Sequence, residues 1–143
     1  MVETATGLQE SCDLIVHSHV LEHLPCNHAY VLFHLHRILT DSGRIVCCIP
    51  VVAGYYDFAT SPALSEDERH RRFGQHNHVA RYGREDLSMS LGKFYDLEDY
   101  DLTRHFDVDD LRRYNIPERI WRGFSPSSVL CLSRLDYRLM LPD

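Results

Sequence analysis

The densest group of chemically capable side chains follows the first apolar run of the chain. Residues 13–17 read DLIVH, a short β-branched run typical of a strand buried on both faces. His17, Ser18 and His19 come at its carboxyl end, and open α/β sheets bind ligands beyond the carboxyl ends of their strands. Histidine also exchanges a proton near neutral pH. We therefore expect these residues to line a binding site, with His19 the first candidate for a catalytic base.

A second group of such side chains lies in an arginine-rich stretch. Residues 69–84 read RHRRFGQHNHVARYGR, and the arginine side chain suits carboxylate and phosphate groups. His78 and Arg81 are close enough in the sequence to share one face of a helix. We expect both to face the cleft beside the first group, with His78 a second candidate base, and Arg69 and Arg72 to stay largely in solvent. The alternative interpretation of the whole stretch is a solvated basic surface.

Three predicted elements would position the first group. Asn27 is a suitable N-cap for a helix over residues 27–43, which carries one apolar stripe and which Gly43 would end. Residues 44–51, RIVCCIPV, are then a second buried strand. Strand, helix and strand make a βαβ unit, whose two strands should run parallel.

The rest of the chain carries weaker signals. Residues 52–65 contain glycine, proline and several small side chains, which indicate an irregular segment. Helices are predicted over residues 65–73, 84–92 and 107–115. A weak strand is predicted over residues 93–100, and a last strand over residues 127–135.

The order of these motifs resembles a known family. The run over residues 13–17 is followed by LEH at 21–23, RILTDSG at 37–43 and FGQHNHVARYGREDL at 73–87. This set is similar to class I S-adenosylmethionine-dependent methyltransferases of type 11. The resemblance implies an α/β fold with a partial Rossmann-like sheet, whose final strand runs antiparallel beside the second. It also implies methyl transfer from S-adenosylmethionine to a small-molecule acceptor.

The resemblance further implies roles for parts of a single domain over residues 1–143. Residues 1–51 would form the cofactor edge, and residues 52–143 the acceptor side with the last strand. The implied cofactor contacts are His17, Ser18, His19, Leu21 and Leu24. The implied substrate contacts are Tyr55, Tyr56, His78, Arg81 and Tyr82. For the substrate contacts, packing of an irregular loop is an equally open interpretation. Glu22 and His23 are interpreted as bracing the turn.

The chain departs from this family at the cofactor end. The family's glycine-rich turn and ribose-binding acid have no counterpart, because Gly7 is the only glycine before Gly43 and Thr4 stands where the family has an aspartate. We expect the chain to represent the C-terminal half of such an enzyme, without its N-terminal strands, and to bind S-adenosylmethionine weakly on its own. The strand over residues 13–17 would then be a sheet edge, which favours self-association or a partner chain. The alternative function is a non-catalytic scaffold that pairs through this edge.

The composition and the residue spacing argue against several other classes of protein. The formal net charge of −6 disfavours binding to nucleic-acid phosphates. No apolar run is long enough for a membrane span and the N-terminus lacks a secretion signal, so we expect a cytoplasmic protein. Histidines are plentiful, but there is no H-E-x-x-H motif and no C-x-x-C pair, and the sequence predicts no metal site.

Overall fold

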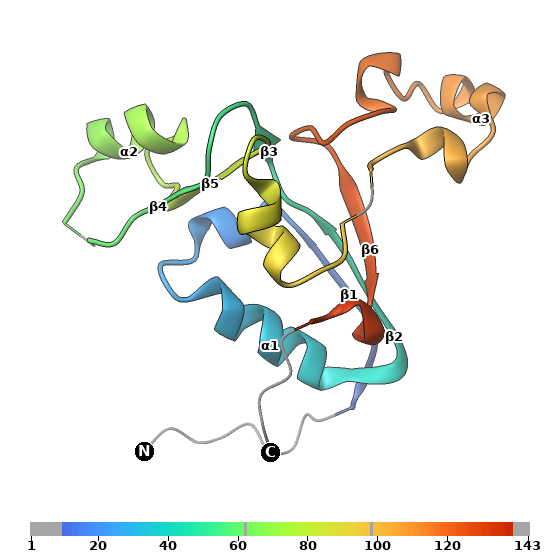
Figure 1. The fold of residues 1–143 in the computed structure, drawn as a ribbon, viewed down its shortest axis with the longest axis horizontal. Helices are drawn as coiled ribbons and strands as arrows, with labels where there is room; N and C mark the ends of the chain where they lie inside the picture. The colour runs from blue at the N-terminus through green and yellow to red at the C-terminus, as the bar shows by residue number, and fades with distance from the viewer. Residues whose placement is uncertain (1–9, 62, 98, 139–143) are drawn as a thin grey trace.

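Two small open sheets form the framework of the chain. The structure is a computed structural model that describes residues 10–61, 63–97 and 99–138. Each sheet has three strands, and helices and short 3-10 turns connect them (Figure 1). The α/β class predicted from the sequence is confirmed. The predictions on Thr4 and Gly7 lie outside the described residues.

The first sheet joins its strands in the order β1–β2–β6. They are β1 (Cys12–Ser18), β2 (Leu39–Cys48) and β6 (Val129–Ser133). β1 runs parallel to β2, with Ile15 opposite Ile45, and β6 runs antiparallel to β2, with Leu132 also opposite Ile45. Both pairings confirm the sequence prediction, and they bring these three side chains to the same face of the sheet.

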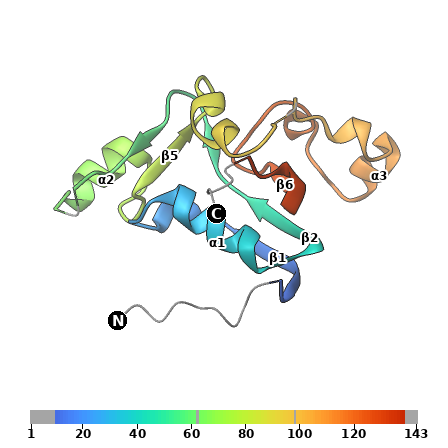
Figure 2. The same ribbon diagram turned by 60° about the horizontal axis from the view of Figure 1, so that its bottom comes forward.

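Helix α1 (His28–Ile38) packs along that face (Figure 2). Leu32 of the helix and Ile45 of β2 are buried in one hydrophobic core. The helix begins where the sequence predicts, because the side chain of Asn27 accepts a hydrogen bond from the backbone N–H of Ala29 at 2.9 Å. The strand, helix and parallel strand thus form the predicted βαβ unit.

Residues 39–43 differ from the prediction. They are extended and begin β2, so α1 ends at Ile38 and Gly43 does not stop it. The hydroxyl of Thr40 donates to the carboxylate of Asp13 at 2.8 Å, a contact between β2 and β1 that depends on the extended backbone. Gly43 serves a close approach instead, since a Cβ there would lie 3.0 Å from the carbonyl oxygens of Cys12 and Thr40.

The second sheet has the order β3–β5–β4. Its strands are β3 (Val51–Val52), β4 (Asp57–Phe58) and β5 (Ala80–Gly83). β5 runs parallel to β3 and antiparallel to β4. Residues 52–65, predicted to be irregular, therefore contribute to two strands. The helical face predicted for His78 and Arg81 is wrong, because β5 is extended and its backbone groups pair with strands on both sides.

Helix α2 (Glu66–Phe73) confirms the prediction over residues 65–73. It begins with a capping box, in which Ser65 and Glu68 satisfy each other's backbone N–H groups. Arg72 of this helix forks onto Asp57 of β4, with N–O distances of 2.9 and 2.6 Å. This pairing lowers the pKa of the Asp57 carboxyl group. The expectation that Arg72 stays largely in solvent is wrong, since its side chain is 37% exposed and fixes α2 to the second sheet.

The rest of the chain is mostly short turns. Helix α3 (Val108–Arg113) begins after Asp107, which caps it, and confirms the helix predicted over residues 107–115. The helix predicted over residues 84–92 is broken into two turns, and the strand predicted over 93–100 is reduced to a single bridge from Tyr95 to Tyr137. The 3-10 turns are η1 (Leu21–His23), η2 (Leu87–Met89), η3 (Leu91–Lys93), η4 (Leu102–Arg104), η5 (Glu118–Ile120) and η6 (Arg134–Asp136).

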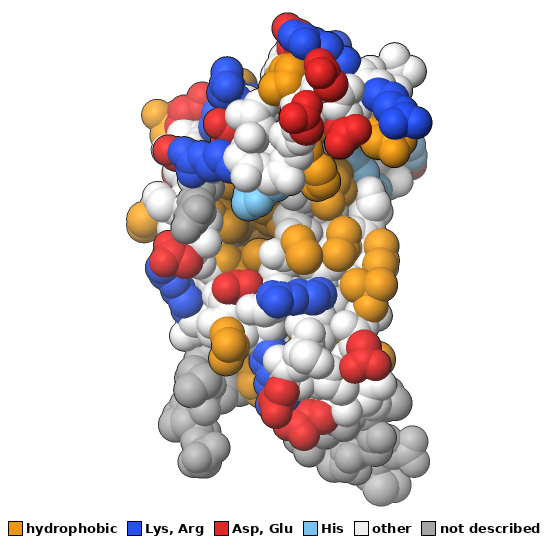
Figure 3. Space-filling view, turned by 90° about the vertical axis from the view of Figure 1, so that its right-hand side faces the viewer, with side chains coloured by type: hydrophobic (Ala, Val, Ile, Leu, Met, Phe, Trp, Pro, Cys, Tyr) orange, Lys and Arg blue, Asp and Glu red, His pale blue; other side chains and the backbone are white. Residues whose placement is uncertain are grey.

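The face of the first sheet opposite α1 is open. Leu14 and Val16 of β1 are 59% and 67% exposed, and Val129 of β6 is 50% exposed. β1 also stands at the edge of the sheet. Figure 3, which views the molecule from the side on which Figure 1 shows β6, has hydrophobic side chains gathered across its middle. In the described part of the chain, no helix has the length and apolar character needed to cross a membrane.

Candidate functional site

The carboxyl end of β1 meets the end of β2. His17 pairs with Cys47 and Ser18 with Cys48, and the backbone N–H of His19 donates to the carbonyl of Cys48 at 2.9 Å. Pro50 follows directly after this part of β2. The structure thus places residues 17–19 at the same end of the sheet as Pro50, where ligands of parallel sheets bind.

His19 turns the chain from β1 into η1. Its φ is +53°, a left-handed backbone conformation that is costly for a residue with a side chain and that is frequent at functional sites. The turn directs the ring toward two polar neighbours. Its Nδ1 lies 3.1 Å from Oε1 of Glu22, and its Nε2 lies 3.7 Å from Sγ of Cys48. The side chain remains 49% exposed, so a solute can reach it.

Glu22, in the middle of η1, is the most deeply buried charged residue described. The side chain is 0% exposed, Oε1 accepts the hydrogen bond from His19, and Oε2 has no hydrogen-bond partner. Its backbone carbonyl accepts the N–H of Val79 at 2.7 Å, which holds the segment before β5 against η1. A buried carboxylate oxygen without a partner is unfavourable, and a bound cation or a proton donor would relieve this cost.

His23 and His78 complete the site from two distant segments. Their rings meet edge to face with centroids 4.6 Å apart. Nδ1 of His23 lies 3.4 Å from the carbonyl oxygen of Asn77, which is 54 residues further along the chain. Burial lowers the pKa of His78, and the neighbouring ring of His23 lowers it further. One ligand atom from each of Glu22, His23 and His78 lies within 4.8 Å of the other two. We call these three residues the Glu22 cluster.

The remaining predicted cofactor contacts are mostly covered. Leu21 is 1% exposed and belongs to the core, and Leu24 packs against that core. Both ring nitrogens of His17 are buried without a hydrogen-bond partner. Burial lowers the pKa of His17, and the nearby Glu22 carboxylate opposes this shift. Only Ser18 and His19 of the predicted set are open to solvent.

Apart from His78, which belongs to the Glu22 cluster, the predicted substrate contacts form two separate pairs. Nε of Arg81 donates to the carbonyl of Tyr55 at 3.2 Å, and Tyr55 is 66% exposed. The rings of Tyr56 and Tyr82 lie 5.6 Å apart, and the hydroxyl of the buried Tyr82 is 2.6 Å from Nδ1 of His28. Burial raises the pKa of Tyr82. The second pair therefore has a packing role between α1 and β5, whereas the first pair is accessible.

Arg69 also differs from the sequence prediction. Its guanidinium donates to the carbonyl oxygens of Leu64 and His78, at 3.3 and 3.4 Å. The side chain is therefore tied to the backbone of the segment that carries His78, rather than surrounded by solvent. This contact, together with the hydrogen bond from Val79 to Glu22, fixes the position of residues 78 and 79.

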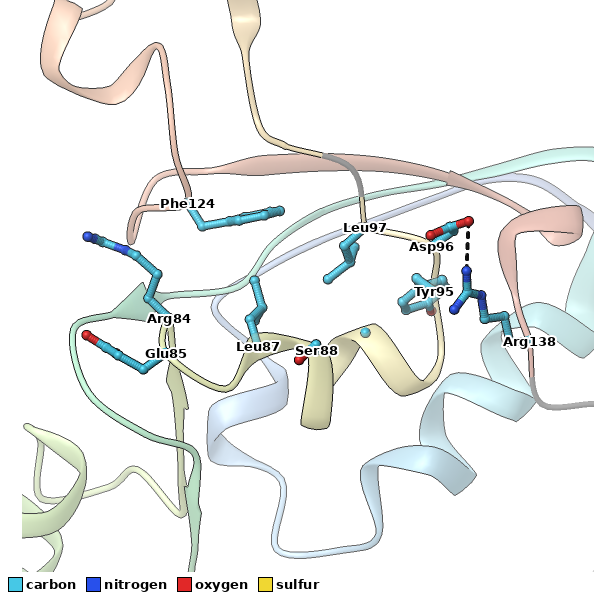
Figure 4. A pocket seen from close by; sticks show the side chains of 10 residues that line it. Arg84, Glu85, Leu87, Ser88, Tyr95, Asp96, Leu97, Phe124 and Arg138 are labelled. Carbon is cyan, nitrogen blue, oxygen red and sulfur yellow. Dashed lines mark ion pairs between the residues drawn. The ribbon is translucent and has the colours of Figure 1, made fainter.

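Two surface hollows lie away from the Glu22 cluster. The larger has a volume of about 350 Å³ and is shown in Figure 4. Arg138 and Asp96 form an ion pair of 2.7 Å at one side of it, and Phe124 and Arg84 lie at the other. The smaller, of about 190 Å³, is lined in part by Tyr56 and Tyr82. Neither hollow is lined by His19 or the cluster, so chemistry rather than size identifies the candidate site.

Sequence reasoning gave Glu22 the role of bracing the turn. The structure also shows that His19, His23 and His78 converge on this residue. The sequence signal for His19 and His23 was their spacing around the LEH turn. His78 was predicted to lie beside this group on a helical face, but the segment before β5 places it there, through the hydrogen bond from Val79 to Glu22.

Comparisons with known proteins add no assignment. No family model matches the chain, and no curated protein or solved structure matches it either. The functional argument therefore depends on the fold and on the geometry of the site.

Proposed function

We propose that this chain supplies part of an S-adenosylmethionine-dependent methyltransferase site, formed by His19 and the Glu22 cluster. The supporting observation is the location of these residues, at the carboxyl end of β1 beside the end of β2. The order of β1, α1 and β2, with β6 antiparallel beside β2, agrees with the family resemblance. We also propose that the strands of this sheet have a Rossmann-like arrangement.

His19 is the proposed proton acceptor. Methyl transfer to a hydroxyl or amine releases a proton, and a histidine can take it up near neutral pH. The hydrogen bond from Nδ1–H of His19 to Glu22 fixes the ring and leaves the lone pair on Nε2. Since the side chain is half exposed, an acceptor can approach this nitrogen directly.

The described residues do not fit the whole of S-adenosylmethionine. Leu21 is buried in the core, and neither hollow is lined by Ser18 or His19. We therefore assign no reaction step to a cofactor held by these residues alone. A pair of missing charge-assisted hydrogen bonds, worth about 1.5–3 kcal/mol each, would weaken binding by roughly two to four decades. Binding by this chain is expected to be weak but located at residues 17–19.

Amide signals of the ¹⁵N-labelled chain test this proposal. Millimolar S-adenosylmethionine should shift the signals of Ser18, His19 and Cys48, and adenosine should shift them less. His19→Ala should reduce these shifts, and His76→Ala, which changes an exposed histidine, should leave them unchanged. Signals that do not respond, or that respond only around the hollow lined by Arg138, would contradict the proposed site.

A scaffold function is the second candidate, and the open face of the first sheet favours it. Leu14 and Val16 expose apolar surface on an edge strand, an arrangement that other chains can pair with. In this case the chain would associate through β1 with a second copy or a partner chain. A self-associating chain whose amide signals ignore S-adenosylmethionine would support the scaffold over the enzyme.

A further inference from the structure

The Glu22 cluster has the donor set of a transition-metal site. Two imidazole rings and one carboxylate hold Zn²⁺ in several catalytic sites and Fe²⁺ in others, and three protein ligands leave positions open for a substrate or water. Mg²⁺ and Ca²⁺ prefer sites made of oxygen atoms alone. The chemistry of the cluster therefore selects a transition ion over these harder cations.

The spacing of the three ligand atoms is close to what one ion requires. Ligand atoms bound tetrahedrally at ~2.1 Å from a metal lie about 3.4 Å from one another. In this structure the ligand atoms of Glu22, His23 and His78 lie within 4.8 Å of one another. Small rotations of side chains would close the difference. The N–H of Val79 is bonded to the carbonyl of Glu22 at 2.7 Å, which holds the segment that carries His78 against η1.

Burial supplies a second and independent observation. Glu22 is 0% exposed, yet its Oε2 has no hydrogen-bond partner. A buried carboxylate with an unsatisfied oxygen costs free energy that a bound cation would remove. His78 is also buried, with 8% exposure. The Glu22 carboxylate, with its unsatisfied oxygen, thus meets the two rings at a place where Glu22 and His78 are buried.

Further contacts hold all three side chains in place, as second contacts do for metal ligands. Nδ1 of His23 faces the carbonyl of Asn77, which leaves the lone pair on Nε2. The ring of His78 packs edge to face against the ring of His23, with centroids 4.6 Å apart. His19 donates to Oε1 of Glu22 and so fixes the carboxylate. Each of the three thus has a second contact that sets its direction, and His19 is a positioning residue.

We propose that Glu22, His23 and His78 bind one divalent transition-metal ion, of the class of Zn²⁺ or Co²⁺. The inference departs from the sequence prediction of no metal, since the three ligands come from two segments that the sequence does not connect. It shares the Glu22 cluster with the methyltransferase proposal but is tested separately, because ion binding is measured without S-adenosylmethionine. The failure of either proposal leaves the other standing.

Titration of the metal-free, untagged chain with Zn²⁺ and with Co²⁺ tests the site. We expect one equivalent of each to bind, and Mg²⁺ in large excess not to compete. Glu22→Gln and His78→Gln should each weaken binding by about 100-fold or more, and His19→Ala by about 10–100-fold. His76→Gln changes an exposed histidine two residues before His78 and should leave binding unchanged. Equal affinity in all variants would overturn the proposal.

Paramagnetic broadening of NMR signals by Co²⁺ tests the site without any variant, and so does not depend on whether the variants fold. In the unchanged chain, Co²⁺ should broaden the ring signals of His23 and His78 before those of any other histidine. Broadening that begins at the exposed His70 and His76 would show binding at the surface and would overturn the proposal. The absence of any broadening at one equivalent would do the same.

Discussion

His36 should make the stability of the chain depend on pH in one direction. The residue is 4% exposed, its Nε2 lies 2.9 Å from the hydroxyl of Tyr95, and its ring stacks on Tyr137 with centroids 4.4 Å apart. Burial lowers the pKa of His36 from 6.5 to about 4; the smaller effect of Asp136 raises it, and that of Arg134 lowers it. His36 is therefore neutral in the folded chain at pH values where it is charged in the unfolded chain.

The direction of this pH dependence follows from the number of protons that each state binds. Between the two pKa values the unfolded chain binds more protons than the folded chain, so the free energy of unfolding falls as pH falls from 6.5 toward 4. Above pH 6.5 the neutral His36 causes no such loss. The whole difference corresponds to roughly 3 kcal/mol, of which about 2 kcal/mol is lost by pH 5. Burial also lowers the pKa values of His17, His28 and His78, so these residues contribute in the same direction.

Urea unfolding at a series of pH values isolates the contribution of His36. His36→Phe keeps a ring against Tyr137 and cannot be protonated, but it leaves the hydroxyl of Tyr95 without its partner. The variant should be less stable than the unchanged chain by about 1–3 kcal/mol at neutral pH. By pH 5 this gap should close by about 2 kcal/mol. His76→Phe, the exposed control, should keep the full pH dependence. Parallel curves for the unchanged chain and His36→Phe would refute the reasoning.

Two further predictions concern the backbone and the sheet edge. Gly83→Ala should destabilise the chain by roughly 3 kcal/mol in urea unfolding, because a Cβ there would lie 2.1 Å from the carbonyl oxygen of Gly54. Gly92→Ala is its control, with a nearest neighbour at 3.3 Å, and should cost roughly 1 kcal/mol or less; similar losses for both would contradict the packing argument. Val16→Lys places a charge on the exposed edge strand and should shift any self-associated form toward monomer in sedimentation velocity. Unchanged sedimentation would show that β1 is not the contact.

The βαβ unit could be predicted because local signals agree there. Residues 13–17 and 44–48 are short apolar runs, Asn27 is a cap, and the helix between them has one apolar stripe. These signals depend on neighbours in the sequence. The last strand was predictable for the same reason, since its apolar residues are continuous.

The second sheet and the Glu22 cluster could not be predicted in this way. The spacing of His78 and Arg81 fits a helix, but β3 and β4 supply the backbone partners that make the segment a strand. Those partners are more than twenty residues away in the sequence. Glu22 and His78 are likewise brought together by the hydrogen bond from Val79, which only the folded chain reveals.

The central position of β2 has a consequence for the order in which the chain folds. Ile45 pairs with Ile15 across a short stretch that contains α1, whereas its pairing with Leu132 closes a loop of more than eighty residues. The longer closure costs roughly 1 kcal/mol more in chain entropy, and non-local pairing is slow. The βαβ unit can therefore form while β6 is still unpaired, with both sides of the unit open. Amides of β6 should be the last of this sheet to gain protection from hydrogen exchange during refolding.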